Sequence, residues 1–279
     1  MTGYAHPHRL METAELGTRL DDGGLAVIEV DEDTTAYEKG HIPGAVALDW
    51  QTELHALPRR DFVSAEQLTA LLRARGVGTN QTIVLYGGNN NWFAAYAYWL
   101  FRLRGIDNVV LLNGGRKKWE LESRPVDTDR PARPATALRT GTARPELRIF
   151  RDEVVARAGT GTMVDVRSPA EFTGELLAPA HLPQEQPHVA GHIPGARNIP
   201  WSKAANDDGT FKPVDELRAL YEGAGVTAGA EVVTYCRIGE RSAHTWFVLT
   251  ELLGFPNVRN YDGSWTEYGS LVNVPVELG

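Results

Sequence analysis

The sequence predicts an α/β protein with two tandem domains, each an open and mainly parallel sheet flanked by helices. Three observations lead to this prediction. The chain has 279 residues, about twice the length of an average domain. A hexapeptide occurs twice, and in each half short β-branched runs alternate with helical patterns. Such alternation is typical of parallel sheets, whose functional sites lie at the carboxyl ends of the strands.

The repeat is detectable at several points of the chain. Gly40–Ala45 (GHIPGA) recurs as Gly191–Ala196, and Ile83–Gly87 aligns with Val232–Cys236. Upstream of the hexapeptide, the sequence separation between matching residues of the two copies is smaller by about 15 residues than it is at the hexapeptide. This difference indicates an insertion in the second copy at Leu176–His188.

The repeat also sets the predicted domain boundaries. The first domain spans residues 1–124 and the second residues 149–279. Residues 125–148 between them are rich in proline and arginine and show no apolar periodicity. Because proline removes backbone donors, we expect an extended linker there.

Periodicity and turn residues place the elements in order. In the first copy Ser64 and Gln67 form a capping-box pattern before a helix that ends near Gly76. The other elements of this copy are strands at 25–30, 82–86 and 109–112 and a helix at 92–104. The second copy has expected strands at 163–166, 232–235 and 258–261 and helices at 215–221 and 242–253.

Composition narrows the functional classes. A net charge of −8 and a pI near 5.5 argue against a general nucleic-acid binder. Trp92–Phe101 is too short to cross a bilayer, so it is predicted to be a buried core helix. The N-terminus has no secretory pattern and the single cysteine cannot form an internal disulfide, so we expect a cytoplasmic protein without membrane partners.

The loop after the strand at 232–235 carries the candidate chemistry. Its sequence, Cys236–Arg241 (CRIGER), connects that strand to the next helix. Backbone N–H groups can surround one point in such a loop, at the positive end of the helix. A cysteine there is expected to be stabilised as the thiolate. Arg237 and Arg241 add positive charge, which Glu240 opposes unless its side chain points to solvent.

The spacing in this loop favours sulfur over phosphate. Cysteine-dependent phosphatases need an arginine six residues after the nucleophile, whereas here Arg241 comes five residues after Cys236. The shorter ring suits a smaller species, the persulfide Cys–S–S⁻.

Several of these motifs together resemble the two-domain rhodaneses, or thiosulfate sulfurtransferases. They are the repeated GHIPGA, Val164–Arg167 (VDVR) and the Cys-Arg-x-Gly-x-Arg loop, in register from about Leu20 to Tyr268. The resemblance implies two rhodanese folds, the first inactive with Gly87 in place of the cysteine. It also implies a pocket at the domain interface.

Carried over by position, the resemblance assigns Cys236 as the persulfide-forming residue. It implies the following substrate-binding residues: Arg237, Ile238, Gly239, Glu240, Arg241, Arg167, Trp201, Trp92 and Phe93. The histidines of the two hexapeptides, His41 and His192, lie in glycine-flanked turns and are interpreted as structural.

The predicted activity is sulfur transfer by double displacement. Cys236 takes the outer sulfur of thiosulfate and passes it to cyanide or a thiol. No metal and no cofactor is implied by the sequence. The alternatives are a 3-mercaptopyruvate sulfurtransferase and a persulfide carrier or regulatory binding module with little turnover.

The loop chemistry favours thiosulfate as the donor. Arg237 follows the nucleophile directly, whereas enzymes that prefer mercaptopyruvate resemble Cys-Gly-Ser/Thr-Gly-Val at this point. Two departures from the animal enzymes, Ile238 and Glu171 in place of basic residues, reduce the positive charge around the donor.

Overall fold

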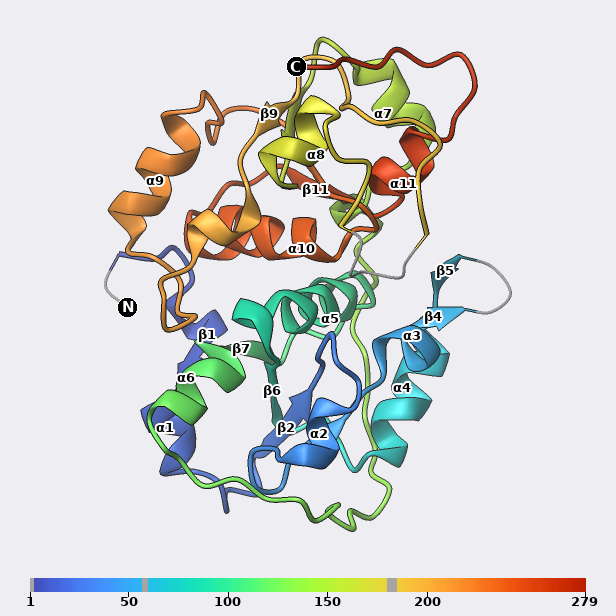
Figure 1. The fold of residues 1–279 in the computed structure, drawn as a ribbon. Coiled ribbons are helices and arrows are strands. Elements are labelled where there is room, and N and C mark those ends of the chain that lie inside the picture. The colour runs from blue at the N-terminus through green and yellow to red at the C-terminus, as the bar shows by residue number, and fades with distance from the viewer. Residues whose placement is uncertain (1–2, 57–59, 180–184) are drawn as a thin grey trace. The chain divides into compact units, whose positions relative to one another are not determined.

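The computed structural model describes residues 3–56, 60–179 and 185–279 and divides into two compact units (Figure 1). The N-terminal unit consists of His8–Pro145 and Ala205–Phe211. The C-terminal unit consists of Glu146–Ala204 and Lys212–Gly279, with the segment that ends at Pro7. No helix in the described ranges is long and apolar enough to cross a membrane.

The N-terminal unit is built on a five-stranded, all-parallel sheet with strand order β1-β7-β6-β2-β3. Its strands are β1 (Leu10–Glu12), β2 (Leu25–Glu29), β3 (Val46–Ala47), β6 (Thr82–Tyr86) and β7 (Val109–Asn113). A short antiparallel pair, β4 (His55–Ala56) and β5 (Asp61–Phe62), lies outside this sheet.

Helices cover the sheet of this unit. They are α1 (Thr13–Gly17), α2 (Ala36–Lys39), α3 (Trp50–Glu53), α4 (Ala65–Ala74), α5 (Trp92–Leu103) and α6 (Gly115–Leu121). Every residue of α5 is buried, which confirms the predicted core helix. The capping box of α4 is also confirmed, since Ser64 Oγ accepts from Gln67 N (3.2 Å) and Gln67 Oε1 accepts from Ser64 N (2.8 Å).

The C-terminal unit repeats this plan with a four-stranded parallel sheet of order β11-β10-β8-β9. The strands are β8 (Thr162–Asp165), β9 (Arg197–Asn198), β10 (Val232–Tyr235) and β11 (Val258–Tyr261). The helices are α7 (Arg151–Arg157), α8 (Pro169–Thr173), α9 (Val214–Glu222), α10 (Glu240–Phe247) and α11 (Ser264–Tyr268), with one π-helical turn at Val248–Leu252. The predicted fold class is therefore confirmed.

One predicted boundary is wrong in a way that affects the site. Helix α10 begins at Glu240, two residues before the expected start at Ser242. The reason is Gly239, which adopts a left-handed conformation (φ 99°) and ends the turn early. Glu240 and Arg241 therefore belong to the first turn of the helix, and the connecting turn is Cys236–Gly239.

The duplication extends to buried hydrogen bonds. Tyr86 Oη accepts from Ile42 N (3.0 Å), and Tyr235 Oη accepts from Ile193 N (3.2 Å). Each tyrosine ends a central strand, and each isoleucine belongs to a copy of the hexapeptide. The bond therefore ties the hexapeptide turn to the sheet in both units.

The hexapeptide histidines make packing contacts of the kind expected for the predicted structural role. His41 stacks on Tyr37 at 3.7 Å, and its Nδ1 lies 2.9 Å from the Tyr37 carbonyl oxygen. His192 stacks on Phe172 at 3.6 Å, with Nδ1 2.8 Å from the Phe172 carbonyl oxygen. In both turns the ring holds the hexapeptide against the preceding helix.

The segment predicted as a linker has no helix or strand over residues 128–144. Its backbone bonds repeatedly to the N-terminal unit. Thr136 N donates to the Arg73 carbonyl (3.2 Å), and Gly141 N donates to the Gly105 carbonyl (2.7 Å). The segment is thus extended and ordered along the first copy.

Candidate functional site

Cys236 lies directly after β10, at the carboxyl end of a central strand of the C-terminal sheet. The turn to α10 requires glycine at its last position. A Cβ on Gly239 would lie 2.6 Å from Asp262 Cα, and the φ of 99° disfavours any other residue. The Gly239 carbonyl accepts from Asn260 Nδ2 (3.1 Å) and Ser242 Oγ (3.0 Å), so the turn is fixed from two elements.

The turn surrounds the sulfur of Cys236 with polar groups, and the residue is fully buried. Gly239 N donates to Sγ at 3.2 Å, and the Ser242 backbone N–H also favours a charged sulfur. Glu240 approaches from the helix side, with Oε2 3.4 Å from Sγ. Sγ is therefore placed between backbone amides and one carboxylate.

Ser264 fixes the backbone of the cysteine and was not predicted as a site residue. Cys236 N donates to Ser264 Oγ (3.0 Å), and that hydroxyl donates to the Tyr261 carbonyl (2.7 Å). Ser264 has a φ of 53°, unusual for a non-glycine residue. Its place in the repeat gives a signal, because it aligns with Gly115, whose φ is 54°.

Arg241 is engaged by a carboxylate that the sequence did not connect with it. Its Nη1 and Nη2 lie 3.0 and 3.1 Å from the two oxygens of Glu171 on α8. Ser168 orients Glu171 through a capping box. Glu171 therefore not only replaces a basic residue, but also neutralises one of the two loop arginines.

Arg237 is buried and contacts the inserted segment of the second copy. Its Nε donates to the Glu185 carbonyl (3.0 Å), which also accepts from Thr266 Oγ1 (3.4 Å). Part of the insertion, residues 180–184, lies outside the described residues. The part that is described reaches the turn that carries the cysteine.

The expected stabilisation of the thiolate is not found in this structure. Burial, with the nearby Glu240 carboxylate, raises the pKa of Cys236, and Arg241 and the turn amides counteract this only in part. Arg237 and Arg241 are accompanied by Glu240 at the sulfur and by Glu171 at Arg241, so the formal charges of these four groups cancel. The sequence-based expectation was wrong because it counted the arginines but could not account for burial.

Three further candidates lie in the same unit. Arg167 is buried against Asp165, with Nη2 2.5 Å from Oδ2, and its Nη2 also donates to the Gly191 carbonyl (2.7 Å). Trp201 meets the ring of His244 edge-on at 5.2 Å. Ile238 is 9% exposed. Their roles toward a substrate remain predictions.

In the first copy the matching turn has no room for a nucleophile. A Cβ on Gly87 would lie 2.2 Å from the Val30 carbonyl oxygen. Trp92 and Phe93 follow this turn at the start of α5, and both are buried. Phe93 packs on Trp50 at 4.6 Å. Their predicted part in a pocket with the second domain stays a prediction.

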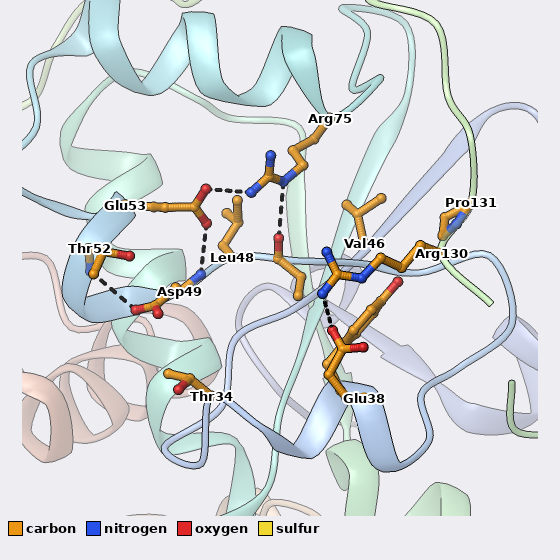
Figure 2. Close-up of a pocket in the computed structure, with 12 residues that line it drawn as sticks. Thr34, Glu38, Val46, Leu48, Asp49, Thr52, Glu53, Arg75, Arg130 and Pro131 are labelled. Atoms are coloured by element: carbon orange, nitrogen blue, oxygen red, sulfur yellow. Dashed lines mark hydrogen bonds and ion pairs between the residues drawn. The ribbon is translucent and has the colours of Figure 1, made fainter. Parts of the chain in front are cut away.

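The N-terminal unit also contains a pocket of about 470 Å³ (Figure 2). None of the predicted site residues lines it. Its arginines are paired, Arg75 with Glu53 and Arg130 with Glu38. In the described part of the chain, no group of three or more His, Cys, Asp and Glu side chains could hold a metal ion.

Comparison with known proteins identifies the family. A family model described as "Rhodanese-like domain" matches residues 12–122 and again residues 150–271. The chain therefore belongs to the rhodanese-like domain family and carries the domain twice.

Its relatives extend over nearly the whole length. A protein of Mycolicibacterium smegmatis named "Putative thiosulfate sulfurtransferase" is 62% identical over 90% of this chain and 91% of its own. The "Sulfur carrier protein TtuD" of Thermus thermophilus is 50% identical over 99% of both chains.

Solved structures agree with this assignment. The 3-mercaptopyruvate sulfotransferase SseA from Escherichia coli superimposes with a TM-score of 0.79 at 26% identity, covering 92% of this chain and 98% of its own. YnjE gives a TM-score of 0.85 at 26% identity, covering 99% of this chain and 70% of its own.

Proposed function

We propose that this protein is a thiosulfate sulfurtransferase that works through a persulfide on Cys236. The observation that carries the proposal is the position of the chain's one cysteine, in a turn at the end of β10 where the Gly239 N–H donates to Sγ. In the first half-reaction Sγ attacks the outer sulfur of thiosulfate. The sulfur–sulfur bond breaks, sulfite leaves with the bonding electron pair, and the persulfide remains.

The second half-reaction regenerates the sulfur-free cysteine. Cyanide, or the thiolate of an acceptor, attacks the outer sulfur of the persulfide, and the Cys236 thiolate leaves. The turn amides that contact Sγ favour the negative charge in both half-reactions. We place this chemistry in the cytoplasm, because a lone cysteine has to stay reduced to carry sulfur.

The direct test is sulfur loading followed by intact mass. Incubation with thiosulfate should add one sulfur atom to the protein, and cyanide should remove it. The Cys236→Ala variant should gain no mass and form no thiocyanate. An adduct or turnover that persists in this variant would refute the assignment of the sulfur carrier.

The choice of thiosulfate as donor depends on Arg237. Thiosulfate is a dianion, and the departing sulfite concentrates its charge, so a guanidinium beside the nucleophile stabilises the transition state. Since Arg241 is neutralised by Glu171, Arg237 is the better candidate for this contact. A charge-assisted hydrogen bond contributes about 1.5–3 kcal/mol, which is about ten- to a hundredfold in kcat/KM.

The Arg237→Gly variant tests the donor. Its kcat/KM for thiosulfate should fall ten- to a hundredfold, with a smaller loss for 3-mercaptopyruvate. A wild-type preference for mercaptopyruvate would refute thiosulfate as the donor. An equal loss for both donors would show that Arg237 does not select between them.

A second candidate is a persulfide carrier with little turnover of its own. The specific observation in its favour is the 50% identity over 99% of both chains to a protein named as a sulfur carrier. Pre-steady-state loading separates the two candidates. A carrier would load one sulfur per chain but would form thiocyanate only slowly in the steady state, whereas an enzyme would turn over many times.

A further inference from the structure

A carboxylate next to the nucleophile has no role in the reaction described so far. Glu240 is the first residue of α10, and its side chain is fully buried. Its Oε2 lies 3.4 Å from Sγ of Cys236, close enough to accept a thiol proton. Burying a carboxylate is costly unless it is paired, so a reason for this placement is needed.

The pairing of Glu240 is incomplete. Its Oε1 receives no hydrogen bond among the described residues, and Arg241 Nε lies 3.9 Å from it. The two Nη atoms of Arg241 are directed at Glu171 instead. Among the described residues, the hydrogen bond that Glu240 receives comes from the thiol of Cys236.

Several other charged groups of the described residues lie around the pair. Arg237 and Arg241 belong to the same turn and helix, and Glu171 reaches the site from α8. Asp262, which follows β11, is held by Arg148, with Oδ1 2.7 Å from its Nε. These cations and carboxylates compensate one another, so none of them alone decides where the thiol proton resides.

The first copy provides an internal comparison. In the repeat Asn91 aligns with Glu240, and Gly87 aligns with Cys236. The Asn91 amide bonds to backbone, accepting from Gly87 N (2.9 Å) and donating to the Leu112 carbonyl (2.6 Å). Where the thiol is missing, the position holds a neutral amide. The carboxylate occurs with the thiol.

We propose that Glu240 accepts the proton of Cys236 as Sγ attacks the sulfur donor. The S–H electron pair then forms the new S–S bond, and the proton resides on Glu240 while sulfite leaves with the electrons of the broken bond. Glu240 passes the proton to the departing sulfite, which leaves as hydrogen sulfite, and returns to its carboxylate form. This inference rests on the proposed sulfur-transfer function.

The Glu240→Gln variant keeps the size of the side chain but cannot accept the proton. Wild-type kcat/KM for thiosulfate should then change little between pH 8 and pH 6, because the base removes the proton during the attack. The variant can react only through thiolate formed beforehand, so its rate should fall about tenfold per pH unit below the pKa of the thiol. We expect a ten- to hundredfold deficit at pH 6 that closes as the pH rises.

Two further variants control for indirect effects. Glu240→Asp retains a carboxylate and should keep part of the flat pH profile. Glu222→Gln, at an exposed position of α9, should match the wild type at every pH. A uniform loss in Glu240→Gln at all pH values, or a gain at pH 6, would refute the proton-acceptor role.

Alkylation by iodoacetamide separates this inference from the proposed function. Because the chain has a single cysteine, intact mass reports Cys236 alone. Wild type should alkylate with a shallow pH dependence and Glu240→Gln with a tenfold change per unit. If wild type behaves so but does not turn over thiosulfate, the proposed function fails and the role of Glu240 stands. Equal slopes in both proteins would overturn the role of Glu240.

Discussion

Replacing Glu171 by glutamine removes one charge from the buried ion pair beneath the site and leaves the side-chain shape unchanged. Both Arg241 Nη atoms lie within 3.1 Å of the carboxylate, and the two side chains are 5% and 1% exposed. Removing one partner of a buried pair costs about 3–5 kcal/mol, because the other charge is left uncompensated. We therefore expect Glu171→Gln to lower the free energy of unfolding at pH 7 by about 3 kcal/mol.

The same pair gives the effect a defined pH dependence. Burial by itself raises the pKa of Glu171, but the charge and hydrogen bonds of Arg241, with the Ser168 amide, outweigh it and leave the pKa below the ordinary value of 4.5. A group with a lowered pKa in the folded state stabilises the protein above its unfolded pKa, and this contribution is lost as the pH falls through the folded pKa. The difference between wild type and variant should therefore shrink below about pH 4.

Urea denaturation followed by circular dichroism at pH 7, 5 and 3.5 measures this difference. Glutamine at position 171 can still form the capping box with Ser168, so the stability of helix α8 itself should be unchanged by the substitution. The control is Glu216→Gln, which removes an exposed partner of Lys212 and should cost less than about 0.5 kcal/mol. A loss below about 1 kcal/mol at pH 7, or an equal loss at pH 3.5, would refute the reasoning.

Three other variants test the turn that carries the sulfur. Ser264→Ala leaves the Cys236 N–H without its acceptor and should cost about 1–3 kcal/mol in urea denaturation; no measurable cost would contradict the contact. Gly239→Ala places a Cβ 2.6 Å from a neighbouring Cα and should abolish sulfur loading by intact mass; normal loading would show that the turn can relax. Gly87→Cys in the Cys236→Ala background should load no sulfur, because its Cβ would meet the Val30 carbonyl at 2.2 Å; loading there would disprove an inactive first copy.

The longer strands of both sheets could be predicted closely from the sequence, whereas the short strands β1, β3, β4, β5 and β9 were not predicted. The strands at Thr82–Tyr86, Val232–Tyr235 and Val258–Tyr261 have the expected bounds, because β-branched runs between turn residues have few alternative structures. Helix α10 was placed two residues late. Its start depends on the left-handed conformation of Gly239. That conformation is stabilised by hydrogen bonds from Ser242, which follows the turn, and from Asn260, which is distant in the sequence.

The electrostatics of the site could not be predicted in the same way. The sequence places Arg237 and Arg241 beside the cysteine, but it does not show that Glu171, seventy residues before Arg241, pairs with it. Nor does it show that the sulfur is fully buried. Local charge spacing alone therefore gave the wrong sign for the thiol pKa, since burial is the largest contribution.

Each copy contains an acid–guanidinium pair with a buried acid, and this shared pair indicates what the fold requires independently of catalysis. In the C-terminal unit Arg167 pairs with Asp165 and donates to the Gly191 carbonyl (2.7 Å). In the N-terminal unit Arg116, from α6, pairs with Glu29 at 2.5 Å and donates at 2.5 Å to the matching glycine carbonyl of its own hexapeptide. The acid and the glycine occupy equivalent positions of the two copies, although the arginine comes from a different element in each.

This recurrence, in a copy without a nucleophile, favours a structural role for Arg167. Its guanidinium also lies 4.9 Å from the centroid of the Trp265 ring, so it is enclosed on several sides. We expect Arg167→Met to lower the free energy of unfolding by about 3–5 kcal/mol, because Asp165 is left as an unpaired buried charge. At a temperature where the variant is folded, its KM for thiosulfate should equal that of wild type. A rise in KM without a loss of stability would instead assign Arg167 to substrate binding, because a contact made only with the donor contributes nothing to folding in its absence.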